Sequence, residues 1–352
     1  MTILKWYFTI AFFLAKGTEC EAFLLKQNSL ISTFKKPLIS TRIIEQTNLR
    51  TDLKKALQIN GGAKVLQMSF NFPVFDNSPL SLSTSIFAIT NAVGFIISIL
   101  TGSHKHLDLL GTGAFALASI PSLISSTSTR VVVSSGAVTI WAIKLASFLF
   151  YRALKLKTDA RLDDVLSTSS GTAGFWVISL VWGIICSLPH TLGTASSSEG
   201  SPITLVLGTI LYVLGLVTES KADYQKWIFK QNNPGKFCNN GLWSISQHPN
   251  FFGNLLLWSG IFVMNADSLV EPIQEGANLW TIILGYRKVF IAFLSPLFMW
   301  TLFNGQASGS FSNTADLANK KYGNDASYSD YMETVPLIIP KLGLWIRALF
   351  TN

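Results

Sequence analysis

Apolar runs long enough to cross a bilayer recur through most of this chain of 352 residues. A helix needs ~20 apolar residues to cross the ~30 Å hydrocarbon core of a membrane. The runs are continuous rather than alternating, and only helices and closed barrels satisfy their backbone in lipid, so helices are expected. Seven spans are predicted, at residues 82–101, 106–125, 131–151, 172–191, 202–218, 250–266 and 286–305.

The scarcity of charge excludes an ordinary soluble protein. Charged residues make up 13% of the chain, where a soluble domain carries about 25%. The sequence therefore predicts an all-α fold, a polytopic membrane bundle of about seven transmembrane helices within residues 79–352. The three cysteines and four histidines are widely dispersed, so neither a disulfide framework nor a metal site is expected.

The first 78 residues are predicted to be a leader and a linker. Residues 1–22 have Lys5 and a short apolar core, as a signal peptide does, with a retained signal anchor as the alternative. Residues 23–44 are basic, hydroxylated and free of acids, which is typical of a transit peptide. Joined at Ala22-Phe23, the two resemble the bipartite leader of proteins that enter complex plastids of algae. A plastid membrane is therefore expected, with the endoplasmic reticulum membrane as the alternative, and residues 45–78 are expected to be a linker.

Basic residues cluster beside the predicted spans, and the net charge is +8. They follow the third and fifth spans and occur in the C-terminal tail, whereas residues 191–202 and 265–278 contain no Lys or Arg. This asymmetry predicts that the three basic regions share one side of the membrane, called the basic face below, where soluble nucleotide cofactors are found. No basic helix with interleaved aromatics lies away from the membrane, so nucleic acid is not an expected partner. Arg287 and Lys288 lie at the opposite end of the last span and must snorkel or pair.

The densest polar stretch follows the fifth span. On a helix, Asp223, Lys226 and Lys230 share one face, because they are spaced by three, four and seven residues. The carboxylate could hold a ribose and the ammonium groups could hold phosphates. The alternative is an amphipathic helix lying on the membrane with a local Asp–Lys pair.

A helix start is predicted at His248-Pro249-Asn250, because proline favours the first position of a helix. Free N–H groups at such a start, on the basic face, suit a pyrophosphate. Gly253 would let a ligand or a neighbouring helix come close. Phe252 could pack a nicotinamide, an adenine or a lipid, or be an ordinary interfacial aromatic.

Three further candidates flank this region. Lys144 lies about two turns inside the third span from Arg152, where a charge is either functional or a snorkelling side chain. Tyr331, in the tail, is either a membrane anchor or a residue that closes a cofactor site.

Three ordered stretches resemble those of the steroid 5α-reductase-like membrane proteins. They are Thr218 to Lys230, Gly241 to Gly253 and Tyr331 to Pro340, and the most similar branch carries a Gly-Leu-Trp…Arg-His-Pro-Asn-Tyr-Phe-Gly-Glu signature. Trp141 to Arg152 is similar to that branch's third-span motif, and the resemblance covers about residues 130–340. It implies a seven-helix bundle that binds NADPH from the cytosolic face. It also implies reduction of a carbon–carbon double bond conjugated to a carbonyl in a sterol or isoprenoid-like lipid.

The resemblance also assigns roles to single positions. It implies cofactor contacts for Asp223, Lys230, Asn250 and Tyr331, a place in the same pocket for His248 and Phe252, and a place near the phosphates for Lys144 and Arg152. Hydride would go to the β carbon while an acid polarises the carbonyl. In the steroid reductases that acid resembles a Tyr–Glu pair on earlier spans. The first three spans here contain no glutamate, so no catalytic residue is assigned.

Four positions depart from the family pattern. Gln247 replaces an arginine, Asn254 a glutamate, Ser179 a glutamine and Lys144 an arginine. The first change removes an expected phosphate contact. The second removes a carboxylate expected near the nicotinamide amide, although an asparagine can still hydrogen-bond it.

Two other functions fit the same architecture. Isoprenylcysteine and phospholipid methyltransferases, which use S-adenosylmethionine, share a His-Pro element and a C-terminal Tyr…Tyr…Ile-Pro. They usually carry paired glutamates before the final Gly…Tyr, which the stretch from Thr314 to Gly323 lacks. A non-catalytic, lipid-binding relative is the other alternative. The sequence assigns neither the substrate nor the oligomeric state.

Overall fold

The computed structural model describes residues 78–155, 163–310 and 314–350. The expected signal peptide (1–22), the expected transit peptide (23–44) and all but the last residue of the expected linker (45–78) lie outside the described residues. Within the described ranges all regular structure is helical.

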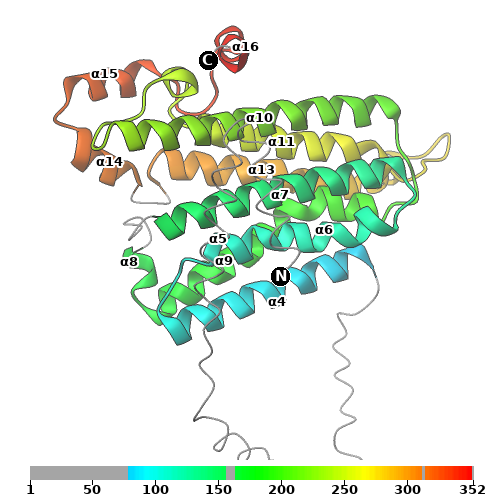
Figure 1. The fold of residues 1–352 in the computed structure, drawn as a ribbon. Helices are drawn as coiled ribbons and strands as arrows, with labels where there is room; N and C mark the ends of the chain where they lie inside the picture. Colours follow the sequence, from blue (N-terminus) through cyan, green and yellow to red (C-terminus); the bar gives the residue numbers. More distant parts are fainter. Residues whose placement is uncertain (1–77, 156–162, 311–313, 351–352) are drawn as a thin grey trace, which may run out of the picture. The chain divides into compact units, whose positions relative to one another are not determined.

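Long helices run side by side and alternate in direction (Figure 1). Six stretches are long and apolar enough to cross a membrane. They are α4 (Pro79–Thr101), α5 (Leu107–Gly111) with α6 (Gly113–Ser125), α7 (Thr129–Lys155), α9 (Ser169–Thr194), α10 (Pro202–Asn232) and α13 (Arg287–Ala307). The short elements are α8 (Asp163–Leu166), η1 (Gly241–Ser244), η2 (Asp267–Leu269), α12 (Leu279–Gly285), α14 (Thr314–Tyr322), α15 (Ala326–Thr334) and α16 (Leu342–Phe350). The expected all-α polytopic membrane bundle is confirmed.

The sixth predicted span, 250–266, forms α11 (Pro249–Ala266), which is not among the six stretches that are long and apolar enough to cross a membrane. Asn254 and Asn265 are both buried on it and both hydrogen-bonded. Because α11 packs against α7, α9, α10 and α13, these amides find partners in protein rather than facing lipid.

Helix α10 is one continuous helix of 31 residues. At 1.5 Å per residue it is ~46 Å long, about 16 Å more than the hydrocarbon core. Its charged second half therefore extends straight out of the membrane on the basic face. The alternative interpretation, a separate amphipathic helix lying on the membrane, is wrong.

One end of the bundle gathers the regions expected on the basic face. The end of α7, the loop after α10, and α14 with α15 all lie at the left of Figure 1. At the other end, Arg287 and Lys288 both pair with Glu271, at 2.8 Å from Arg287 Nη2 to Oε1 and 3.1 Å from Lys288 Nζ to Oε1. These two bases were expected either to snorkel or to pair, and in the structure they form ion pairs.

Helices α10 and α11 touch backbone to backbone along a seam of four glycines. Added Cβ atoms would lie 2.5 Å from backbone nitrogens of the facing helix at Gly208, Gly253 and Gly260, and closer still at Gly215. Small residues let helices in a membrane approach this closely, and the contact then relies on van der Waals packing. The seam fixes the register between the polar half of α10 and the start of α11.

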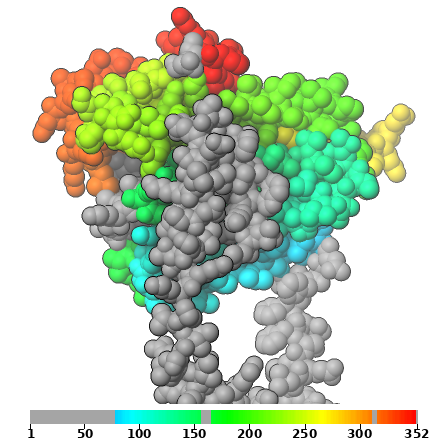
Figure 2. Space-filling view, in the orientation of Figure 1, coloured from blue at the N-terminus to red at the C-terminus, as the bar shows by residue number. Residues whose placement is uncertain are grey.

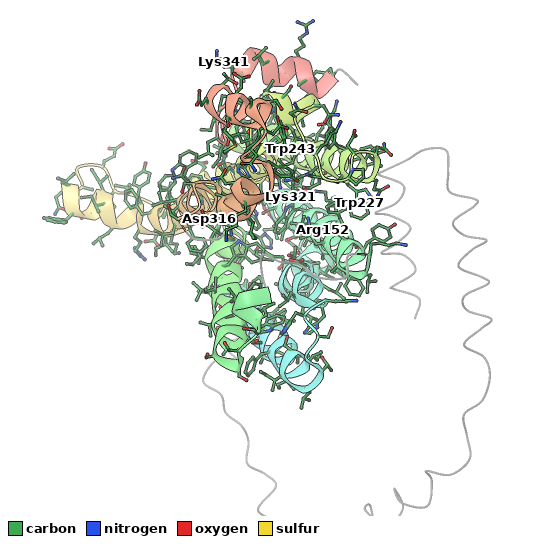
Figure 3. The ribbon with its side chains drawn as sticks, turned by 90° about the vertical axis from the view of Figure 1, so that its left-hand side faces the viewer. Arg152, Trp227, Trp243, Asp316, Lys321 and Lys341 are labelled. Atoms are coloured by element: carbon green, nitrogen blue, oxygen red, sulfur yellow. The ribbon has the colours of Figure 1, made fainter. Side chains whose placement is uncertain are left out.

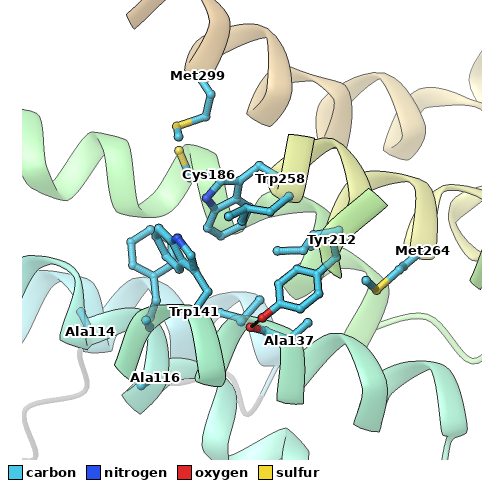
Figure 4. Close-up of a cluster of buried hydrophobic side chains, with 14 of the residues drawn as sticks. Ala114, Ala116, Ala137, Trp141, Cys186, Tyr212, Trp258, Met264 and Met299 are labelled. Carbon is cyan, nitrogen blue, oxygen red and sulfur yellow. Dashed lines mark hydrogen bonds between the residues drawn. The ribbon is translucent and has the colours of Figure 1, made fainter. Parts of the chain in front are cut away.

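Aromatic side chains fill the centre of the bundle (Figure 4). Phe115 meets the rings of Trp141, Trp182 and Trp258 at centroid distances of 5.2, 4.9 and 5.4 Å. Trp141 and Trp258 are 5.0 Å apart and nearly perpendicular, and edge-to-face contacts of this kind stabilise beyond the area they bury. Tyr212 closes one side of the cluster by donating to the Ala137 carbonyl at 2.7 Å.

A buried arginine joins three helix ends away from the basic face. Arg130 donates to Asn265 Oδ1 at 2.8 Å and to the Ser198 carbonyl at 2.9 Å. Asn265 in turn donates to Ser134 Oγ at 3.0 Å, and that hydroxyl also lies 3.0 Å from His190 Nδ1. This network ties the start of α7 to the ends of α9 and α11.

Candidate functional site

The polar face of α10 carries the candidate site. Glu219, Asp223, Lys226 and Lys230 follow one another at spacings of four, three and four, so they form one row along the helix. Asp223 lies within electrostatic range of Glu219, Lys144, Arg152 and Lys226. Figure 3 looks onto this end of the bundle, with Arg152, Trp227 and Trp243 around the ends of α7 and α10.

A pocket of about 140 Å³ lies between the outer part of α10, the start of α11 and the C-terminal tail. Four of the predicted site residues line it: Lys226, Lys230, His248 and Tyr331. The other lining side chains that matter for the site are Phe237, Trp243, Gln247, Gln306, Tyr322 and Tyr328. The structure thus joins the key stretch and the tail in one place.

Aromatic rings and lysines form the wall of this pocket. Phe237 packs against Tyr322, Tyr328 and Tyr331 at centroid distances of 6.0, 5.2 and 5.3 Å. Lys230 Nζ donates to the Tyr322 hydroxyl at 2.7 Å and also to the Lys236 carbonyl. Lys226 Nζ lies 4.0 Å from the centroid of a Trp243 ring, close enough for a cation–π interaction.

The tail is held onto the segment before α11 by several hydrogen bonds. Tyr331 donates to the Trp243 carbonyl at 2.8 Å. Gln247 Nε2 donates to the carbonyls of Met332 and Val335, at 3.0 and 2.7 Å, and its backbone N–H donates to the Pro336 carbonyl at 2.9 Å. Gln247, which replaces the family arginine, therefore fastens the tail.

His248 is uncharged at neutral pH. Burial, with a smaller contribution from the charge of Lys226, lowers the pKa of His248 to about 4. Its ring stacks on Phe251 at a centroid distance of 4.9 Å. A neutral imidazole can accept or donate a hydrogen bond in the pocket without adding charge.

A second polar centre lies deeper, around Glu219, a residue that the sequence analysis did not single out. Glu219 is 2% exposed. Its carboxylate accepts from Lys144 Nζ at 2.8 Å, Asn254 Nδ2 at 2.6 Å and Trp141 Nε1 at 3.4 Å. Lys144 is thus a partly buried ion-pair partner of the buried Glu219 rather than a snorkelling side chain. A glutamate at the end of an apolar run was a signal in the sequence that could have indicated this centre. Nothing in the sequence indicated that its partner is Lys144, 75 residues earlier.

The contact with Asn254 bears on one departure from the family pattern. The resemblance expects a carboxylate at position 254, on α11. Here the amide at that position donates to a carboxylate from α10, so a buried acid is still present, one helix away. The first three spans contain no glutamate, and α10 supplies one just beyond the fifth predicted span.

Unpaired polar atoms connect the two centres. Gln247 Oε1, Asn250 Oδ1, Asn254 Oδ1 and Trp258 Nε1 are all buried and have no hydrogen-bond partner among the described residues. Their spacings of three, four and four put them on one face of α11 and the turn before it. They run from the pocket toward the aromatic core. Buried polar atoms left without partners are costly, so such a row suits a bound polar molecule or ordered water.

The remaining candidates lie outside the pocket. Phe252 packs edge-to-face on Trp345 of α16, with centroids 5.3 Å apart. Gly253 belongs to the glycine seam, so the close neighbour is α10 rather than a ligand. Lys144, Arg152 and Asp223 surround the Glu219 centre instead.

The profile of one protein family matches most of this region. That family is described as "Protein of unknown function (DUF1295)", and the match covers residues 94–335. The chain belongs to this family. No curated protein and no solved structure matches the chain. The DUF1295 match contains both polar centres and ends before α16, which begins at Leu342.

Proposed function

We propose that the protein is a membrane-embedded reductase that uses NADPH to reduce a carbon–carbon double bond conjugated to a carbonyl in a sterol or isoprenoid-like lipid. The steroid 5α-reductase-like motifs suggest this activity. The observation that carries it is the row of unpaired polar atoms that leads from a lysine- and tyrosine-lined pocket toward a buried glutamate. NADPH, when bound, supplies the hydride.

The residues present fit the polar parts of a nicotinamide dinucleotide. Lys226 and Lys230 line the pocket and would hold phosphates. The start of α11, just after His248, offers free backbone N–H groups to the same charges. The unpaired Asn250 and Asn254 oxygens are acceptors, which suit the amino group of a carboxamide.

The deeper centre would orient and polarise the reactants. Lys144 and Asn254 hold the Glu219 carboxylate in one place, so its charge is fixed before any ligand arrives. Trp258 offers a buried N–H without a partner among the described residues, and such a donor can stabilise negative charge that develops on a carbonyl oxygen. No catalytic acid is assigned beyond this.

The size of the pocket requires the tail to move. A pocket of about 140 Å³ is smaller than the ~300–1,000 Å³ of pockets that enclose drug-sized ligands. In the structure the Lys230 ammonium group already donates a hydrogen bond to the Tyr322 hydroxyl of α14. A dinucleotide would therefore displace α14 and take over the bond that Lys230 makes with Tyr322.

Nucleotide titration of the detergent-purified protein tests this proposal. Quenching of tryptophan fluorescence by NADPH is expected, with affinity reduced about 100-fold or more in Lys226→Ala/Lys230→Ala, since each of the two charged hydrogen bonds is worth ~1.5–3 kcal/mol. Tyr322→Phe should have the opposite effect, about fivefold tighter binding, because it frees Lys230 from a bond worth ~1 kcal/mol while keeping the ring.

Lys320→Ala is the matched control, an exposed base of α14 that does not line the pocket. Binding of S-adenosylmethionine in place of NADPH would move the protein to the methyltransferases. Binding of neither by a folded sample would leave a non-catalytic, lipid-binding protein. A Tyr322→Phe variant that weakens NADPH binding would contradict the role of α14.

We also propose a plastid membrane as the location, with the endoplasmic reticulum as the alternative. The basic, acid-poor composition of residues 23–44 supports it. Residues 1–44 fused to a fluorescent protein should reach the plastid of a complex-plastid alga. Retention of that fusion in the endoplasmic reticulum would favour the alternative.

A further inference from the structure

Helix α16 has one apolar side that the described residues cover and one exposed apolar stripe, and Leu344, 48% exposed, lies opposite that stripe. Trp345 and Leu349 are 5% and 8% exposed. Leu342, Ile346 and Phe350, spaced by four residues, are 65%, 47% and 82% exposed. At 100° per residue these three form a stripe beside the buried pair, and Arg347 lies on the other side of the stripe.

The buried side fixes α16 to the rest of the protein. Trp345 Nε1 donates to Thr218 Oγ1 at 3.0 Å, and its ring meets Phe252 edge-to-face. Lys221 Nζ donates to the Leu349 carbonyl at 3.2 Å, a cation at the C-terminal end of a helix where it is favourable. These contacts hold the helix in one position along α10.

That position is the boundary of the membrane on the basic face. Thr218 and Lys221 stand where the apolar run of α10 ends and its charged run begins, and Phe252 lies in the first turn of α11. Figure 1 shows α16 end-on and Figure 3, turned by 90°, shows it lengthwise, so its axis lies across the axes of the spans. In the space-filling view α16 stands out from the bundle (Figure 2).

The charged residues of this segment are all basic. Residues 335–350 contain Lys341 and Arg347 and no acidic residue. An apolar stripe beside basic residues, on a helix lying across the spans at their boundary, matches a helix that lies in a membrane interface. Basic residues there attract anionic lipids, by ~1 kcal/mol for each charge near the surface.

We propose that α16 is an interfacial helix that binds the lipid surface of the same membrane. The stripe of Leu342, Ile346 and Phe350 enters the acyl region, and Lys341 and Arg347 meet anionic head groups. This inference is independent of the proposed reductase activity, and it concerns a segment beyond the DUF1295 match. Through Trp345 and Thr218, it also couples lipid binding to the residue next to Glu219.

Quenching of a fluorophore on the full chain in lipid nanodiscs tests the proposal. Single cysteines at Ile346→Cys and Leu342→Cys report on the stripe, and Leu344→Cys, on the opposite side of the helix and 48% exposed, is the control. Cys186 and Cys238 are buried, so the parent chain gives the labelling background. At 342 and 346, acyl-chain nitroxides should quench several-fold more strongly than aqueous iodide, and the order should reverse at 344.

Lipid composition tests the charged side. The ratio of nitroxide quenching to iodide quenching at 342 and 346 should be larger in discs that contain phosphatidylglycerol than in discs of phosphatidylcholine alone. The variant Lys341→Gln/Arg347→Gln should abolish that increase. Equal access of iodide to 346 and 344 would overturn the proposal. Protection of 346 from both quenchers would also overturn it, because a protein surface such as a second copy would then cover the stripe. Equal contrast in both lipids would overturn the head-group contact.

Discussion

Replacing Lys144 with methionine is expected to lower the free energy of unfolding by ~3–5 kcal/mol, because the buried Glu219 carboxylate would lose its only ion-pair partner among the described residues. Asn254 and Trp141 would remain as neutral donors, which do not replace a positive charge. Thermal unfolding of the detergent-solubilised protein measures the effect.

The double variant Lys144→Met/Glu219→Gln should recover most of the loss, since it removes both charges and leaves an amide that can still pair with Asn254. Lys155→Met, an exposed lysine at the end of the same helix, is the control and should change stability little. If Lys144→Met behaved like Lys155→Met, the ion pair would not contribute to the fold. If the double variant were no more stable than the single one, the loss would come from packing rather than from charge.

The second large effect is expected at the glycine seam. In Gly253→Ala the new methyl group would lie 2.5 Å from the Glu219 nitrogen and 2.8 Å from the Gly215 carbonyl oxygen. Both are backbone atoms, so the helices themselves must separate. Overpacking of this kind costs ~1–3 kcal/mol, and occasionally more. Thermal unfolding should show the loss, and NADPH affinity should fall with it, because α10 and α11 carry the two sides of the site.

Gly174→Ala is the matched control. Gly174 lies within α9 with nothing within 4 Å of an added Cβ, so alanine there should be neutral or should stabilise by up to ~1 kcal/mol. Equal melting temperatures for the two variants would mean that α10 and α11 are not in backbone contact.

The elements of the bundle were predictable because bilayer thickness fixes the length of an apolar run. The predicted span 202–218 begins where α10 begins, and the predicted span 250–266 starts one residue after α11 does. Proline at the first helical position predicted the start at Pro249, and Pro202 occupies the same position in α10. The sequence left open whether the residues after 218 bend onto the membrane, and only the continuous helix answers that.

The site was predictable in its outer half and not in its inner half. Lys226, Lys230 and His248 could be grouped from local spacing and loop charge. Glu219 and Lys144 could not be joined, because which faces of two distant helices meet depends on packing across the whole bundle. The family pattern directed attention to position 254, whereas the acid lies across the seam.

Helix α16 was missed for a different reason. Nine residues are too few to cross a membrane. In a run such as Leu-Gly-Leu-Trp-Ile almost every residue is apolar, so the sequence does not show which side of the helix is buried. The contacts of Trp345 with Thr218 and Phe252, and of Leu349 with Lys221, distinguish its buried side from its exposed one.

The crossed indoles of Trp141 and Trp258 have a consequence for spectroscopy. Their rings lie 5.0 Å apart on α7 and α11, close enough for their excited states to mix. Circular dichroism in the indole bands then depends on how these two helices pack, and it would be lost if they separated even while each stayed helical. Trp243, beside the pocket, stands apart from this pair. Among the ten tryptophans of the chain, this pair thus reports on the packing of the interior, and Trp243 lies where it can report on the pocket.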